Sequence, residues 1–296
     1  MQHTSNNIFD KMMRLDRRWV FLFLVIVCVI TYTVPFTIPI FPEPEVKSIY
    51  NFLDSLPEGD IVLIAIDYDP NNLAELHPMT YAVVEHLWRK KVKVIFTSLS
   101  QNGPGMADQA IRDISDSLAV TKTYNGVEYP GREIVNGVDY CFLGYKPYYA
   151  LIILGMGQDF RLHFPNDYYG TPLDDLPMMK GVINYDQVDC VVDLSGGNIT
   201  DAWIAYGQGR FNFPLMLGLT GVMTAQYYPF LGSGQVKGIM GGLLGAAQYE
   251  ELADNPGRAK DGMRIQLFAH YVIILFIILG NFGYFMTRRK NQEGVN

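Results

Sequence analysis

Hydrophobic residues form two long unbroken runs near the ends of this chain and a series of shorter runs between them. Trp19 to Phe41 and Gln266 to Met286 are almost free of charge, and each is near the ~20 residues that an α-helix needs to cross a bilayer. Between them, short apolar runs alternate with amphipathic stretches. We therefore predict transmembrane helices over 19–41 and 266–286 that flank a folded domain over 45–255.

The domain is predicted to be built around Ile61 to Asp67, a continuous apolar run that ends at turn residues. Such a run is typical of a strand buried on both faces of a parallel sheet. Similar runs predict strands over 92–98, 138–144, 190–194 and 215–219. Helices are predicted over 46–56, 77–90, 106–119, 148–163, 221–231 and 234–253, with another beginning near Thr200, and turns or a small hairpin over 121–137.

This alternation predicts an α/β fold, because strands separated by helices are joined by right-handed crossovers into a parallel sheet. We expect a Rossmann-like, doubly wound, mostly parallel sheet of about five strands. The segment 148–163 is ambiguous, since Ala150 to Leu154 could equally form a strand.

Basic residues cluster outside both apolar runs, before Trp19 and at Arg288 to Lys290. The positive-inside rule then predicts cytoplasmic tails over 1–18 and 287–296, with the domain on the other side of the cell inner (plasma) membrane. A cleaved signal peptide is the alternative for the first run. That run is longer than usual and lacks a small-x-small cleavage site, which favours an uncleaved anchor.

Charge and cysteine content argue against nucleic acid as a partner and against a zinc site. The net charge is −7 and no basic stripe lies outside the membrane flanks, so nucleic acid is not expected as a partner. The three cysteines show no zinc-like spacing, and buried thiols are favoured over a pair between Cys141 and Cys190. No cofactor or metal is predicted.

Polar residues follow the predicted strands, where ligands bind in open α/β sheets. The candidate ligand-binding residues are Asp67, Asp69, Ser98, Lys146, Ser195, Gly196, Gly197 and Thr220. The alternative is ordinary turn and capping chemistry, which uses the same residue types. Ser195 as a nucleophile with Lys146 as base, and a cation at Asp67 and Asp69, are two further hypotheses. Ser195 lacks the G-x-S-x-G context of a nucleophile elbow.

Glycines concentrate near the end of the predicted domain. Gly238, Gly241, Gly242 and Gly245 fall at helical spacing within the predicted helix 234–253. Because glycine inside a helix costs up to about 1 kcal/mol relative to alanine, we expect this face to serve close packing. The surface against which it packs is predicted to be either the sheet or a partner helix.

The opening of the domain, a helix over 46–56 and strands over 61–67 and 92–98 around a helix, resembles the extracytoplasmic domain of auxiliary proteins of gliding-motility ABC transporters. That resemblance implies a non-catalytic partner in a membrane complex. We therefore expect a non-enzymatic, transport-related subunit or scaffold of a membrane assembly, which associates with copies of itself or with other membrane-protein subunits. An extracytoplasmic domain that binds or hydrolyses a small ligand at the strand ends is the alternative.

Overall fold

The computed structural model describes residues 16–34, 36, 38–255 and 257–293. The chain divides into two compact units, a folded domain over 40–260 and a helical unit over 1–39 and 261–296. Most of the predicted tail over 1–18 lies outside the described residues.

The folded domain contains a six-stranded parallel sheet with the strand order β5-β2-β1-β6-β7-β8. Its strands are β1 (Ile61–Asp67), β2 (Lys93–Ser98), β5 (Tyr140–Tyr145), β6 (Cys190–Ser195), β7 (Leu215–Leu219) and β8 (Val236–Gly241). Numbered along the chain, the order is 3-2-1-4-5-6, the Rossmann arrangement, in which the strand order reverses between β1 and β6. The predicted α/β class and parallel sheet are confirmed.

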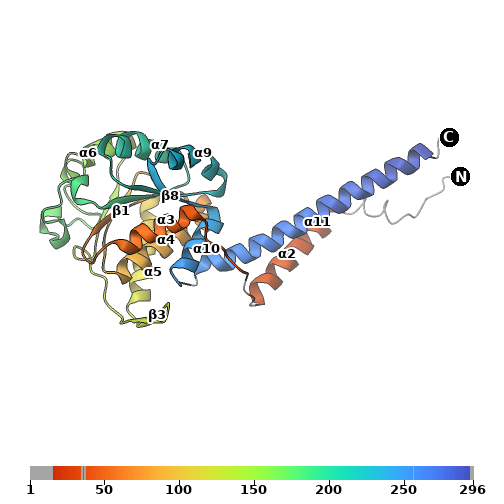
Figure 1. Ribbon diagram of the computed structural model, residues 1–296, viewed down its shortest axis with the longest axis horizontal. Helices are drawn as coiled ribbons and strands as arrows, with labels where there is room; N and C mark the ends of the chain where they lie inside the picture. Colours follow the sequence, from red (N-terminus) through yellow and green to blue (C-terminus); the bar gives the residue numbers. More distant parts are fainter. Residues whose placement is uncertain (1–15, 35, 37, 256, 294–296) are drawn as a thin grey trace. The chain divides into compact units, whose positions relative to one another are not determined.

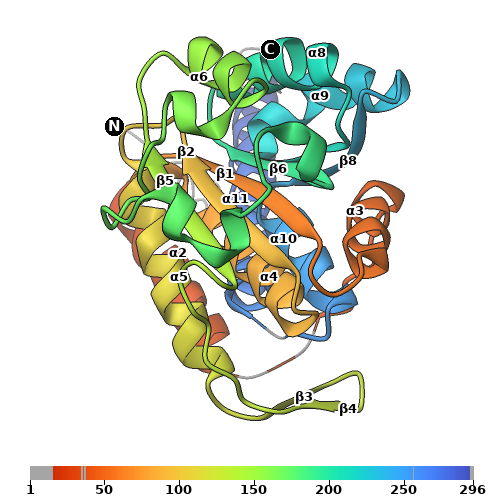
Figure 2. The same ribbon diagram turned by 90° about the vertical axis from the view of Figure 1, so that its left-hand side faces the viewer.

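Helices cover both faces of the sheet (Figures 1 and 2). One face carries α3 (Pro44–Ser55), α4 (Leu73–Arg89), α5 (Gly103–Leu118) and α10 (Gly242–Leu252). The other carries α6 (Tyr149–Met156), α7 (Ile199–Ala202), the π-helical turn Trp203–Gln208, α8 (Gly209–Phe211) and α9 (Gly221–Gly232). This two-sided cover explains why the strands are apolar without alternation.

The segment over 148–163 is a helix, α6, although it ends earlier than predicted, at Met156. The turn-rich region contains a two-stranded hairpin, β3 (Lys122–Tyr124) and β4 (Val127–Tyr129), closed by Asn125 and Gly126. Asn125 and Gly126 both have positive φ, as a tight hairpin turn requires.

The predicted helix over 234–253 was wrong in its first part, because Val236–Gly241 is the sixth strand, β8. The four glycines therefore do not form one helix face. A Cβ on Gly238 would lie 2.4 Å from Ile49 Cγ1 and 2.6 Å from the Glu45 carbonyl oxygen, and one on Gly245 would lie 2.8 Å from the Met240 carbonyl carbon. Each glycine thus admits a close contact inside the domain. Glycine is unfavourable inside a strand, so the sequence pattern of Val236–Gly241 did not predict a strand there.

The two buried cysteines are free thiols. Cys141 lies on β5 and Cys190 on β6, and two other strands, β2 and β1, separate them in the sheet. At about 4.8 Å per strand spacing, they are too far apart for a disulfide.

The helical unit contains α2 (Arg17–Thr33) and most of α11 (Arg258–Glu293). The rings of Phe23 and Phe276 meet edge to face at 5.8 Å, so the two helices pack together. In the described part of the chain, one helix is long and apolar enough to cross a membrane, the 29 residues Arg258–Met286. This bears out an apolar helix over 266–286.

The prediction of a second membrane-spanning helix over 19–41 was wrong in its length. The helix α2 ends at Thr33 and contains 17 residues. At 1.5 Å per residue it covers about 26 Å, less than the ~30 Å hydrocarbon core. Pro35 and Pro39 follow in the sequence, and prolines so close together prevent the helix from continuing.

Candidate functional site

The carboxyl ends of the six parallel strands share one edge of the sheet, as predicted. Because the strand order reverses between β1 and β6, the loops after these two strands border the position where Rossmann-like folds bind ligands. The loop after β1 has the sequence Asp67-Tyr-Asp-Pro-Asn-Asn and contains no glycine. It therefore lacks the phosphate-binding fingerprint of dinucleotide-binding proteins.

Asp67 is buried and holds neighbouring elements together. Its Oδ1 accepts a hydrogen bond of 2.6 Å from the Leu99 amide, and its Oδ2 accepts one of 2.9 Å from Trp203 Nε1. The carboxyl group of Asp193 on β6 lies near enough to affect the pKa of Asp67, and the sequence pattern did not single out Asp193.

Asp193 is fully buried beside Asp67. Its Oδ2 accepts a hydrogen bond of 2.7 Å from Thr200 Oγ1, whereas no described donor reaches its Oδ1. Burial raises the pKa of both carboxyl groups, and the negative charge of Asp67 raises that of Asp193 further. Because two donors already stabilise Asp67 as a carboxylate, Asp193 is the member of the pair that holds a proton more strongly.

Asp69 and Ser98 are engaged in local hydrogen bonds. Asp69 Oδ1 accepts bonds of 2.8 Å from Ser100 Oγ and 3.0 Å from Asn102 Nδ2. The buried Ser98 hydroxyl lies 2.7 Å from the Ile66 carbonyl oxygen, to which it donates. Among the described residues, no group of three or more His, Cys, Asp or Glu side chains is arranged to hold a metal ion.

Ser195 and Lys146 are not brought together. Ser195 ends β6 and Lys146 follows β5, and two strands separate β6 from β5. Three strand spacings amount to about 14 Å, too far for Lys146 to take a proton from the serine. The Ser195 hydroxyl oxygen instead accepts a hydrogen bond of 3.3 Å from the Gly197 amide, which is turn chemistry.

The loops at this edge are closed by side chains of the domain itself. A Cβ on Gly196 would lie 1.9 Å from Asn72 Nδ2, so Asn72 fills the space beside that glycine. Thr220 is the N-cap residue of α9 and makes no side-chain capping bond. Glu75 takes that role, because its Oε2 accepts a hydrogen bond of 2.7 Å from the Gly221 amide.

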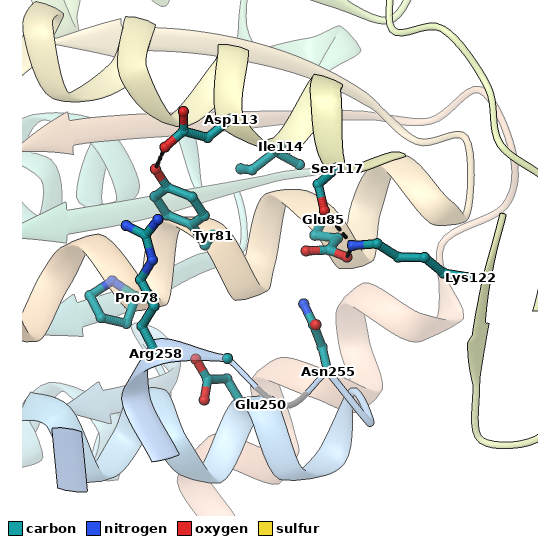
Figure 3. Close-up of a pocket in the computed structure, with 11 residues that line it drawn as sticks. Pro78, Tyr81, Glu85, Asp113, Ile114, Ser117, Lys122, Glu250, Asn255 and Arg258 are labelled. Atoms are coloured by element: carbon teal, nitrogen blue, oxygen red, sulfur yellow. Dashed lines mark hydrogen bonds and ion pairs between the residues drawn. The ribbon is translucent and has the colours of Figure 1, made fainter. Parts of the chain in front are cut away.

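A second candidate site lies on the other side of the domain, in a polar cleft of about 320 Å³ (Figure 3). One wall comes from α4, α5 and the start of β3, and contains Tyr81, Glu85, Asp113, Ser117 and Lys122. The other comes from α10 and the connection to α11, and contains Glu250, Asn255, Gly257 and Arg258. Charges of both signs therefore face one cleft.

Most polar groups of the cleft are engaged. Tyr81 donates a hydrogen bond to Asp113, and Lys122 Nζ lies 3.1 Å from Glu85 Oε1 (Figure 3). Glu250 caps the first turn of α11, because its carboxylate oxygens accept hydrogen bonds of 3.0 Å from the amides of Ala259 and Lys260. Burial raises the pKa of Glu250 to about 7, although these amide donors oppose the shift.

Sequence reasoning did not identify this cleft. One local signal was available, since Glu85 interrupts the apolar face of α4 between Val84 and Leu87. A buried glutamate on such a face requires partners. Its partners come from residues 37 and 39 positions later in the chain, which only the tertiary fold places beside it.

Comparison with known protein families, curated proteins and solved structures finds no match to this chain. The assignment of a function therefore rests on the geometry of the two candidate sites and of the surface.

Proposed function

We propose that this chain is a non-enzymatic, membrane-anchored subunit of a membrane protein assembly, whose folded domain docks on another membrane subunit through α6. The observation that carries this proposal is the exposed apolar side of that helix. Tyr148, which precedes α6, is 79% exposed, and Leu151 within it is 58% exposed, while Ile152, Ile153 and Met156 are buried. A helix that is apolar on every side is normally covered on every side.

The surroundings of α6 extend this surface. The helix packs against the π-helical turn Trp203–Gln208, where Tyr206 is also exposed. Tyr148 itself has a φ of 65°, in the left-handed region that bulky side chains rarely occupy. Backbone strain of this kind persists where the surrounding structure enforces it, and it concentrates at functional positions. Exposed apolar patches of this kind mark interaction sites.

The hydrogen bonding at the strand ends supports a non-catalytic role. Asp67 and Asp69 accept hydrogen bonds from internal donors, and Lys146 is too far from Ser195 to act as its base. Glu75 occupies the amino terminus of α9, a position where an anionic ligand could otherwise bind. The resemblance of the domain's opening to transporter auxiliary proteins makes transport-related subunits the partner class that we propose.

Docking through α6 is tested by placing a photo-cross-linking residue at Tyr148 or Leu151 in the full-length protein in its membrane. We expect cross-links to a second chain from these two positions and none from Val127, an exposed apolar residue on the hairpin. In detergent, Leu151→Ser should lower the mass of the complex measured by light scattering, and Val127→Ser should leave it unchanged. A wild-type monomer without position-specific cross-links would rule out the proposal.

We also propose the two-pass arrangement, with α2 accompanying α11 in the bilayer, both termini in the cytoplasm and the domain outside. The packing of α2 on α11 and the basic residues after Met286 support it. A membrane-impermeant maleimide applied to intact cells should label Val127→Cys and not Asn296→Cys, each compared with the wild-type protein. Labelling of the reverse pattern would show the opposite orientation.

A further inference from the structure

The polar cleft of Figure 3 contains an arginine that interacts with Tyr81 and has no carboxylate partner among the described residues. Among the described carboxylates, none lies within ion-pair distance of the exposed Arg258 guanidinium, whose carbon Cζ lies 5.0 Å from the centre of the Tyr81 ring. The side-chain amide of Asn255 makes no hydrogen bond with the described residues. Figure 3 shows the Arg258 guanidinium beside Tyr81, across the cleft from Asn255. An arginine fork without a carboxylate partner is suited to an incoming carboxylate.

The opposite wall of the cleft contains an unused acceptor. Glu85 is only 6% exposed, and its Oε1 accepts hydrogen bonds from Lys122 Nζ and the Tyr124 hydroxyl. No described donor reaches its Oε2, and Figure 3 shows the carboxylate facing the cleft. An ammonium group bound in the cleft could donate to this second oxygen.

We propose that this cleft binds a small zwitterion of the α-amino-acid class. Arg258 binds its carboxylate, and Glu85 Oε2 accepts a hydrogen bond from its ammonium group. A simple anion would lie near three carboxyl groups, those of Glu85, Asp113 and Glu250, and a simple cation would lie near Arg258 and Lys122. A zwitterion can place its carboxylate at Arg258 and its ammonium group at Glu85. The volume of about 320 Å³ is at the lower end for ligand pockets, which suits so small a molecule.

The position of the cleft gives binding a structural consequence. Glu85 belongs to α4, whereas Asn255 and Arg258 belong to the connection between α10 and α11 and to the first turn of α11. A ligand held between them would join this connection to the body of the domain. The inference does not rest on the docking surface of α6, because it uses none of its residues.

The test is calorimetric titration of the full-length protein in detergent with the common α-amino acids, and with acetate and ethylamine as the isolated carboxylate and ammonium. We expect at least one amino acid to bind and neither fragment to bind comparably. Arg258→Gln should weaken the affinity about 10- to 100-fold, the loss expected for charge-assisted hydrogen bonds. Hydrogen exchange at residues 254–258 should slow when the amino acid is bound.

Arg112→Gln, at an exposed arginine of α5, is the matched control and should bind like the wild type. Glu85→Gln should also lower the affinity. This substitution removes the negative charge that pairs with Lys122 and accepts from Tyr124. If Glu85→Gln fails to fold, Arg258→Gln decides the test. Binding of acetate or ethylamine as tight as that of the amino acid would overturn the zwitterion assignment. The absence of binding by any amino acid at millimolar concentration would overturn the site itself.

Discussion

Above about pH 6.5, the free energy of unfolding of the folded domain should fall as the pH rises, and it should fall less steeply in Asp193→Asn. The carboxyl group of Asp193 retains its proton in the native state, because burial and the neighbouring Asp67 raise its pKa. In the unfolded chain the same group is ionised above about pH 4. The native state therefore binds more protons, and the free energy of unfolding falls by about 1.4 kcal/mol per pH unit until the native pKa is reached.

The measurement is confined to pH values above about 6.5, because at lower pH two buried histidines make the free energy of unfolding rise with pH instead of fall. Burial lowers the pKa of His77 and of His86 to about 4. Below about pH 6.5 the unfolded chain protonates these histidines and the native state does not, so acid destabilises the fold through them. Above about pH 6.5 these histidines are mostly neutral in both states. Glu250, whose pKa burial raises to about 7, loses its proton in the same range in both proteins, so the difference between wild type and Asp193→Asn reports Asp193.

Asparagine at position 193 keeps the acceptor for Thr200 and removes the carboxyl group whose charged form burial and Asp67 disfavour. At about pH 8, Asp193→Asn should therefore be more stable than the wild type. Urea unfolding of the full-length protein in detergent, followed by tryptophan fluorescence, measures both curves. Asp116→Asn, at an exposed carboxyl of α5, should follow the wild type. Equal slopes in wild type and Asp193→Asn would contradict the assignment of the proton.

Glu250→Ala should destabilise the first turn of α11 and lower the free energy of unfolding by about 3 kcal/mol. The carboxylate accepts the amides of Ala259 and Lys260, and Ala259 is fully buried. Hydrogen bonds to a charged group contribute about 1.5–3 kcal/mol each, and a buried amide left without an acceptor adds its desolvation penalty. Gly257 packs against the same carboxylate, since a Cβ there would lie 2.3 Å from Glu250 Oε1.

The measurement is amide hydrogen exchange over 257–260 together with urea unfolding. Exchange at these amides should accelerate in Glu250→Ala. Glu251→Ala is the neighbouring control, because Glu251 is exposed and forms only a surface ion pair with Lys260, worth under about 1 kcal/mol. If both variants behaved alike, Glu250 would not be the residue that anchors this turn.

The sequence by itself determined the class of the fold and most of its elements. Strands buried on both faces are apolar throughout, so Ile61–Asp67 and the strands that pair with it in the sheet are distinguishable from amphipathic helices without knowledge of the fold. It did not reveal β8, because Gly238 and Gly241 make that segment a poor strand locally. The approach of α3 and α9 to these glycines is a tertiary requirement.

The candidate sites depended on tertiary structure more strongly. The pattern placed Asp67 at a strand end correctly, but it could not show that Leu99 and Trp203 donate hydrogen bonds to it, or that Asp193 lies beside it on the adjacent strand. The polar cleft joins Glu85 to Arg258, which are more than 170 positions apart in the chain. Periodicity reports which face of an element is buried. The pairing of buried charges across elements is decided by how the helices pack on the sheet, and a single sequence contains no local signal for that.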